Sequence, residues 1–107
     1  MITQHVVTYD GDITLTRLPA GRAEGFVWLS FVAAGFGIDS WHIHDHVHLS
    51  WLDGRPGEVA GNGRGGGDGP HHFLIEVRDA GYDRLLIRYV EGDDVISHEV
   101  VELPSRT

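Results

Sequence analysis

The chain has 107 residues and a formal charge of −8 with neutral histidines, a length that fits one domain, residues 1–107, with a single hydrophobic core. It contains no cysteine, which excludes disulfides and thiolate metal sites, and no lysine, which excludes Schiff-base chemistry and a Walker phosphate loop. The acidic balance and the dispersed arginines argue against a nucleic-acid surface.

No apolar run approaches the roughly 20 residues that a membrane-spanning helix needs. The first residues lack the basic and apolar regions of a secretory signal. We therefore expect a protein without a membrane span that no signal peptide exports. Its expected place is the cytoplasm or a particle assembled inside the cell.

The first third of the chain predicts strands. Residues 5–9 and 12–18 alternate and are rich in β-branched side chains, and Asp10-Gly11 between them is typical of a hairpin turn. Residues 19–21 break the pattern. Residues 26–34 are apolar on both alternating sets, which favours a central strand covered on both faces, with a short buried helix as the alternative.

Residues 41–51 read Trp-His-Ile-His-Asp-His-Val-His-Leu-Ser-Trp, and this alternation predicts an extended strand. One face would carry the four imidazoles of His42, His44, His46 and His48, and the other would pack in the core. Asp45 falls on the apolar face, so we expect it at a bulge, a sheet edge or the rim.

Turn signals separate the remaining segments. Residues 53–57 predict a turn, and residues 61–69, Gly-Asn-Gly-Arg-Gly-Gly-Gly-Asp-Gly, predict a flexible glycine-rich loop. Residues 71–78 alternate like a half-buried strand, and residues 82–91 and 95–103 read as a closing hairpin.

Seven strand-like segments without an amphipathic helix predict an all-β fold, an antiparallel β-sandwich of about seven strands. Immunoglobulin-like topology is a reasonable guess from strand number and length, although the paired cysteines of a true immunoglobulin domain are absent. A small barrel or a jelly roll is the alternative architecture.

The histidine row predicts metal ligation, because imidazoles two residues apart on a strand point the same way and can converge on one ion. The candidate metal ligands are His42, His44, His46 and His48, with His72 or Glu76 from a later strand completing the shell for zinc, nickel or copper. The string at 42–46 is similar to the His-x-His-x-Asp-His motif of metallo-β-lactamase-like hydrolases. It is one residue short before the aspartate and does not assign the chain to that family.

Three functions remain open from the sequence. The favoured one is a non-catalytic interaction or structural module of a larger assembly, binding a protein partner or a second copy, because no catalytic constellation is complete and no catalytic residue can be named. The second is a metal-binding protein or small metalloenzyme that uses the histidine row. The third is a pH-responsive surface, since protonation would add like charges along one strand.

Overall fold

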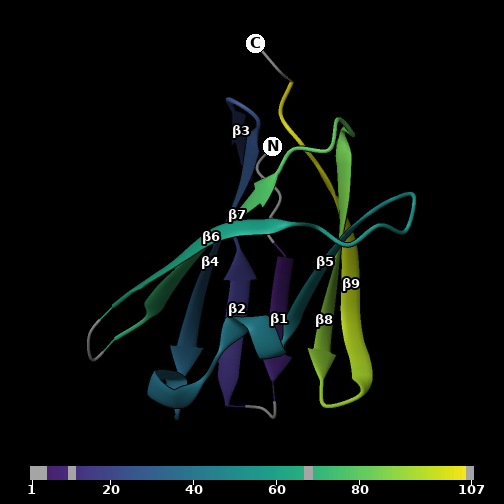
Figure 1. The fold of residues 1–107 in the computed structure, drawn as a ribbon. Helices are drawn as coiled ribbons and strands as arrows, with labels where there is room; N and C mark the ends of the chain where they lie inside the picture. Colours follow the sequence, from purple (N-terminus) through teal and green to yellow (C-terminus); the bar gives the residue numbers. More distant parts are fainter. Residues whose placement is uncertain (1–4, 10–11, 67–68, 106–107) are drawn as a thin grey trace.

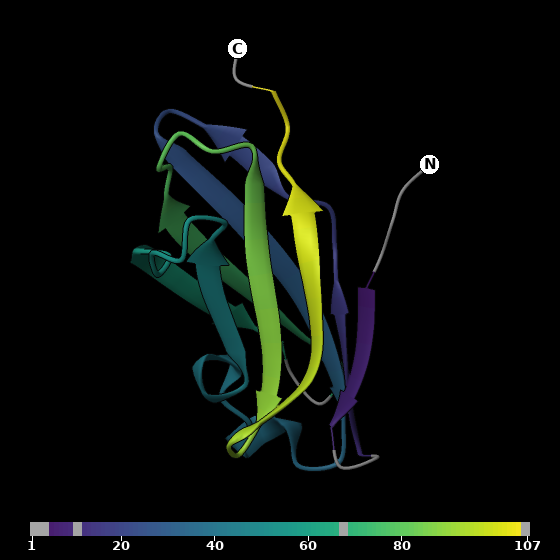
Figure 2. The ribbon, with the colours of Figure 1, turned by 90° about the vertical axis from the view of Figure 1, so that its right-hand side faces the viewer.

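The computed structural model describes residues 5–9, 12–66 and 69–105, which form two antiparallel sheets (Figure 1). The larger sheet is built from β1 (His5–Tyr9), β2 (Ile13–Arg17), β4 (Phe26–Gly35), β7 (His71–Arg78) and β6 (Val59–Gly65), in that order, with the short β3 (Gly21–Ala23) beside β4. The smaller sheet contains β5 (Val47–Trp51), β8 (Arg84–Glu91) and β9 (Asp94–Glu102), in that order. Figure 2 shows the smaller sheet in front of the larger one. The expected all-β sandwich is confirmed.

The strand order is that of a constant-type immunoglobulin sandwich. The order β2-β4-β7-β6 corresponds to strands A, B, E and D, and β5-β8-β9 corresponds to C, F and G. Strand β1 is an additional edge strand next to β2. The likeness concerns topology alone.

The core lies between the two sheets because strand periodicity sends every second side chain inward. The inner face of β4 carries Val27, Leu29, Phe31 and Ala33, all fully buried. Facing residues from the smaller sheet include Leu85, Ile87 and Tyr89 of β8.

The other face of β4, with Phe26, Trp28 and Val32, is only half-buried, so the expected covering of both faces is wrong for this side. The strand assignment for β4 is confirmed over the helical alternative. The opening hairpin is also confirmed by the pairing of β1 with β2, while the expected Asp10-Gly11 turn lies outside the described residues.

The strand expected over residues 41–51 begins only at Val47. Two single 3-10 turns, η1 (Ile38–Ser40) and η2 (Ile43–Asp45), precede it, and backbone hydrogen bonds from Asp45 N to His42 O and from His46 N to Ile43 O close the second. A continuous strand would have aimed Asp45 at the core. The turn exposes this carboxylate while still burying Ile43.

The flexible loop expected over residues 61–69 is wrong for its first half, because residues 61–65 belong to β6 and pair with β7. Backbone hydrogen bonds to β7 stabilise this strand, and these bonds do not depend on the side chains that the glycines lack. Residues 67–68 lie outside the described part of the chain.

Candidate functional site

The six predicted metal ligands lie in three separate places. His42 and His44 are exposed on the segment around η2, and His48 is exposed on the outer face of the smaller sheet, opposite Arg88. His72 and Glu76 belong to the outer face of β7 in the other sheet. Within the described ranges there is no group of three or more histidine or acidic side chains placed to share an ion. The expected face of four imidazoles is therefore wrong, and metal binding stays a prediction.

His46 anchors the turn segment in the sandwich. Its ring stacks on Trp41, with centroids 4.7 Å apart, and meets the edge of Tyr9 at 4.9 Å. Its backbone carbonyl accepts hydrogen bonds from the Tyr9 hydroxyl at 2.9 Å and the Val90 N–H at 2.8 Å. Burial, together with the nearby charge of Glu91, raises the pKa of Tyr9 far above its usual range, which keeps this hydroxyl a donor.

A cluster of paired polar groups closes the β1–β9 side of the sandwich. The Arg17 Nε donates to the Glu99 carboxylate at 2.9 Å, and the Tyr89 hydroxyl donates to the same carboxylate. Burial first, and the bond to Glu99 second, raise the pKa of Tyr89 far above its usual range. His5 stacks on Tyr89 and shares a 2.9 Å hydrogen bond with Ser97. Every group has a partner inside the cluster, which indicates a structural role.

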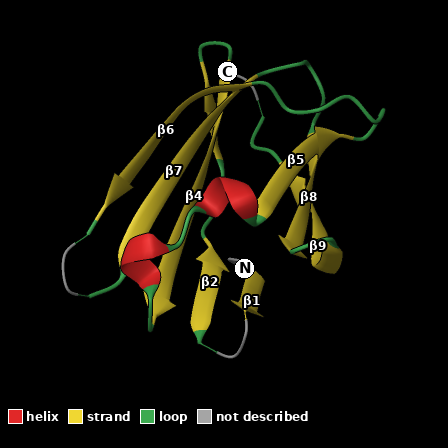
Figure 3. Cartoon of the chain, turned by 60° about the horizontal axis from the view of Figure 1, so that its bottom comes forward, coloured by secondary structure: helices red, strands yellow, loops and turns green. Residues whose placement is uncertain are grey.

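Strand β6 is the last strand at one end of the larger sheet, where it lies beside β7, which separates it from β4 (Figure 3). No strand in the described ranges pairs with its other edge. A bulge between Val59 and Gly61 leaves residues 61–65 as its regular part, and all of these except the half-buried Gly61 are exposed. Other edge strands carry single tertiary contacts: the chain at Pro56 forms an isolated bridge to Ser50 of β5, and a His5–Ser97 side-chain bond joins β1 to β9.

Shallow hollows lie on both faces of β6. The outer hollow, of about 250 Å³, is lined by residues 61–63 with Leu74 and Glu76 of β7. It exists because Gly61 and Gly63 have no side chain on that face, and a Cβ on Gly63 would meet nothing within 4 Å. Leu74 is 43% exposed there.

The inner hollow, of about 110 Å³, lies on the opposite face of the same strand. Its walls are His42, Ile43 and His44 on one side and residues 62–64 with Phe73 on the other. Two of the four histidines of the row thus meet beside β6. Asn62 and Gly63 line both the outer and the inner hollow, so a polypeptide segment lying along the β6 edge would reach both hollows.

Arg64 fixes the wall of the inner hollow. Its guanidinium Nη1 donates to the carbonyl of Trp41 at 2.6 Å and its Nη2 to the carbonyl of Ile38 at 2.5 Å, while Nη2 and Nε lie 2.9 Å and 3.2 Å from His71 Nδ1. The same group lies 4.9 Å above the centre of the Phe73 ring. The only charged side chain of β6 therefore points inward, to the turn segment, and leaves the edge itself uncharged.

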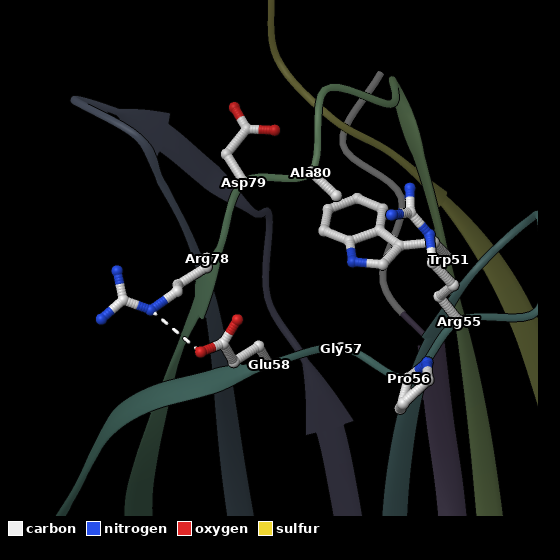
Figure 4. Close-up of a pocket in the computed structure, with 8 residues that line it drawn as sticks. All are labelled: Trp51, Arg55, Pro56, Gly57, Glu58, Arg78, Asp79 and Ala80. Carbon is white, nitrogen blue, oxygen red and sulfur yellow. Dashed lines mark ion pairs between the residues drawn. The ribbon is translucent and has the colours of Figure 1, made fainter.

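A larger pocket, of about 610 Å³, opens where the chain crosses between the sheets (Figure 4). Trp51, Pro56 and Ala80 form its apolar surface, and Glu58 at its rim pairs with Arg78 at 3.2 Å. Figure 4 shows the Arg78 guanidinium turned away from the Trp51 indole.

The loops beside this pocket are tied together by Asp53, Arg55 and Tyr82. The Tyr82 hydroxyl donates to Asp53 at 2.8 Å, and Arg55 donates to both residues. The Arg55 backbone N–H and the Tyr82 hydroxyl, by donating to the Asp53 carboxylate, lower its pKa. The charged groups here are therefore paired: Arg55 with Asp53, and Arg78 with Glu58.

Comparison with protein-family models, with curated proteins and with solved structures finds no match to this chain. The part of the chain that the structure describes contains no helix with the length and apolar character to cross a membrane.

The residues that shape the β6 edge were missed at the level of the sequence. A signal was present, since Gly61, Gly63 and Gly65 recur with the period of two that is typical of a strand. Reading that segment as a strand beside residues 71–78 would have placed its open glycine face next to Leu74.

Proposed function

We propose that this protein is a non-catalytic interaction module that binds an extended segment of a partner protein as an added strand along β6. One observation carries the proposal: an unpaired strand edge with a hollow on each face. In strand addition, backbone hydrogen bonds supply affinity, and hollows for alternate side chains supply specificity. The edge and the two hollows match these two requirements.

The character of the edge supports this proposal. Proteins protect exposed edge strands with charges, prolines or bulges, because unpaired N–H and C=O groups recruit other chains. Between residues 61 and 65, β6 has no proline, and its one charge, Arg64, is engaged on the inner side. The bulge protects only the start of the strand, at Val59–Gly61.

The composition of β6 favours a different protein over a second copy as the partner. A stable interface buries about 1,200 Å² or more in total. Three of the five residues in 61–65 are glycine, so a β6–β6 pair would bury little side-chain surface. A partner strand that brings its own large side chains can fill both hollows.

A phage-displayed library of seven-residue segments, selected on the whole protein, tests the proposal. Selected peptides should bind and should slow amide hydrogen exchange in residues 61–65. Successive residues of a strand point their N–H groups to opposite edges, so Asn62→Pro and Gly63→Pro form a matched pair. One proline breaks the ladder to β7 and lowers the melting temperature. The other removes a donor from the open edge.

The variant that retains the melting temperature should lose peptide binding. If peptides bind it as they bind the unaltered protein, or if they protect amides elsewhere in the chain and not those of β6, strand addition at this edge is wrong. Recovery of no binding peptide from the library would also contradict the proposal.

A further inference from the structure

The register of β6 predicts the side chains that a bound strand should carry. Gly61 pairs with Glu76, Asn62 with Ile75 and Gly63 with Leu74. Since Ile75 is in the core, Asn62 belongs to the inner face, and the two glycines belong to the outer face. A partner residue opposite Gly61 or Gly63 would therefore extend its side chain over the outer hollow. A partner residue opposite Asn62 would extend its side chain over the inner hollow.

The position opposite Gly63 is apolar. Leu74 is the neighbour of Gly63 on β7, is 43% exposed, and has Ser30 of β4 on its far side. A large apolar side chain from an added strand would lie across the bare glycine and cover Leu74, the arrangement by which cross-strand side chains compensate for glycine in a sheet.

The position opposite Gly61 favours a cation. A Cβ on Gly61 would lie 3.6 Å from the Glu76 Oε1, so this carboxylate oxygen borders the outer hollow. The other oxygen, Oε2, accepts a 2.8 Å hydrogen bond from the Trp28 indole, which holds the carboxylate in place. An arginine or lysine in the added strand would find a fixed, half-buried acceptor there.

The position opposite Asn62 favours an acid. His42 and His44 border the inner hollow, and imidazole N–H groups donate to carboxylates. Arg64 also lines this hollow, and its positive charge attracts an anion, although its own donors are engaged. No acidic side chain lines this hollow among the described residues.

We infer, on the basis of the strand addition proposed above, that the partner segment carries an apolar–acidic–basic triplet running antiparallel to β6. The order follows from the direction, since an antiparallel strand meets Gly63, Asn62 and Gly61 in turn. Every strand pair of the larger sheet is antiparallel, and antiparallel pairing is the more stable form per residue.

Three blocked peptides of identical composition test the inference: acetyl-Ser-Thr-Ile-Glu-Arg-Thr-Ser-amide, the same peptide with the triplet Arg-Glu-Ile, and the same peptide with Ile-Arg-Glu. Calorimetry should show the first binding about tenfold more tightly than the others, equivalent to one favourable charged contact. Equal affinities would overturn the triplet while leaving strand addition intact. Binding by library-selected peptides but by none of these three would overturn it as well.

A reciprocal exchange of charge assigns the basic position. Glu76→Gln retains the acceptor for Trp28 and should weaken the Ile-Glu-Arg peptide about tenfold. Glu76→Arg should reverse the preference and favour an Ile-Glu-Glu triplet. Glu102→Gln, at an exposed carboxylate on β9 of the other sheet, removes the same charge away from β6 and is a control with no expected effect on either peptide. If Glu76→Gln leaves the affinity of the arginine peptide unchanged, Glu76 does not recognise the partner's cation.

Discussion

Replacement of Arg17 by methionine should remove a large fraction of the folding free energy. Arg17 is 6% exposed, and its Nε lies 2.9 Å from the carboxylate of Glu99, whose side chain is 11% exposed. Removing one partner of such a pair costs about 3–5 kcal/mol, because the remaining charge stays desolvated. Since Glu99 retains the hydroxyl of Tyr89, we expect Arg17→Met to fall near the lower figure. Domains of this size are stable by only about 5–15 kcal/mol.

The double variant Arg17→Met/Glu99→Gln separates the lost pair from lost packing. Because glutamine is uncharged, the double variant leaves no unpaired charge buried, and the glutamine oxygen still accepts the hydroxyl hydrogen of Tyr89. The double variant should therefore be more stable than Arg17→Met alone, by about 2 kcal/mol, the size of coupling typical of contacting residues. Arg84→Met provides an exposed control, because its 3.8 Å pair with Glu102 is solvated and should contribute less than about 1 kcal/mol.

Urea unfolding followed by tryptophan fluorescence gives these free energies. With a slope of about 1–2 kcal/mol per molar urea, Arg17→Met should lower the midpoint by roughly 1.5–3 M. A loss under 1 kcal/mol would refute the assignment of a buried ion pair. So would a double variant whose loss equals the sum of the two single losses, since Arg17 and Glu99 would then be uncoupled.

Three further predictions concern other parts of the molecule. The pKa values of Tyr9 and Tyr89 are raised in the folded state, so above pH 10 the unfolded chain loses these protons first. The free energy of unfolding should therefore fall by up to about 1.4 kcal/mol per pH unit for each tyrosine. Unfolding measured between pH 9 and 11 should show a shallower decline for the Tyr→Phe variants. Gly35→Ala should prevent or severely weaken folding, because a Cβ there would overlap the carbonyl preceding β2, whereas Gly63→Ala should shift the melting temperature by only a few degrees. Arg64→Met should free residues 38–46, seen as faster amide exchange in that segment, while the exchange of β4 stays unchanged.

The sequence was sufficient for the elements in which alternation and composition agree. In residues 71–78, Phe73, Ile75 and Val77 alternate with polar residues, and the structure shows the same alternation of buried and exposed side chains. The closing hairpin was predicted for the same reason. Its second strand places His98 and Glu99 on opposite faces, with His98 exposed and Glu99 half-buried in the Arg17 cluster.

The misses occur where the two signals conflict. Alternation in residues 41–46 favours a strand, but Asp45 opposes it, and the cost of burying a carboxylate is greater than any strand preference. In β6, the glycines oppose a strand, but the ladder to β7 and the inward bonds of Arg64 stabilise one. Both outcomes depend on residues distant in the sequence, which a local pattern does not contain.

The unequal width of the two sheets has a consequence for how this protein could change over time or in the laboratory. The smaller sheet has three strands and the larger has six, and the turn segment around η2 borders a hollow on the inner face of β6. Exposed residues there, such as His44 and Asp45, and the open position Gly63 can be randomised without altering the layers beneath. Under the proposed strand addition, the β6 edge would be a compact scaffold for selecting new peptide specificities, with Arg64 and the core left untouched.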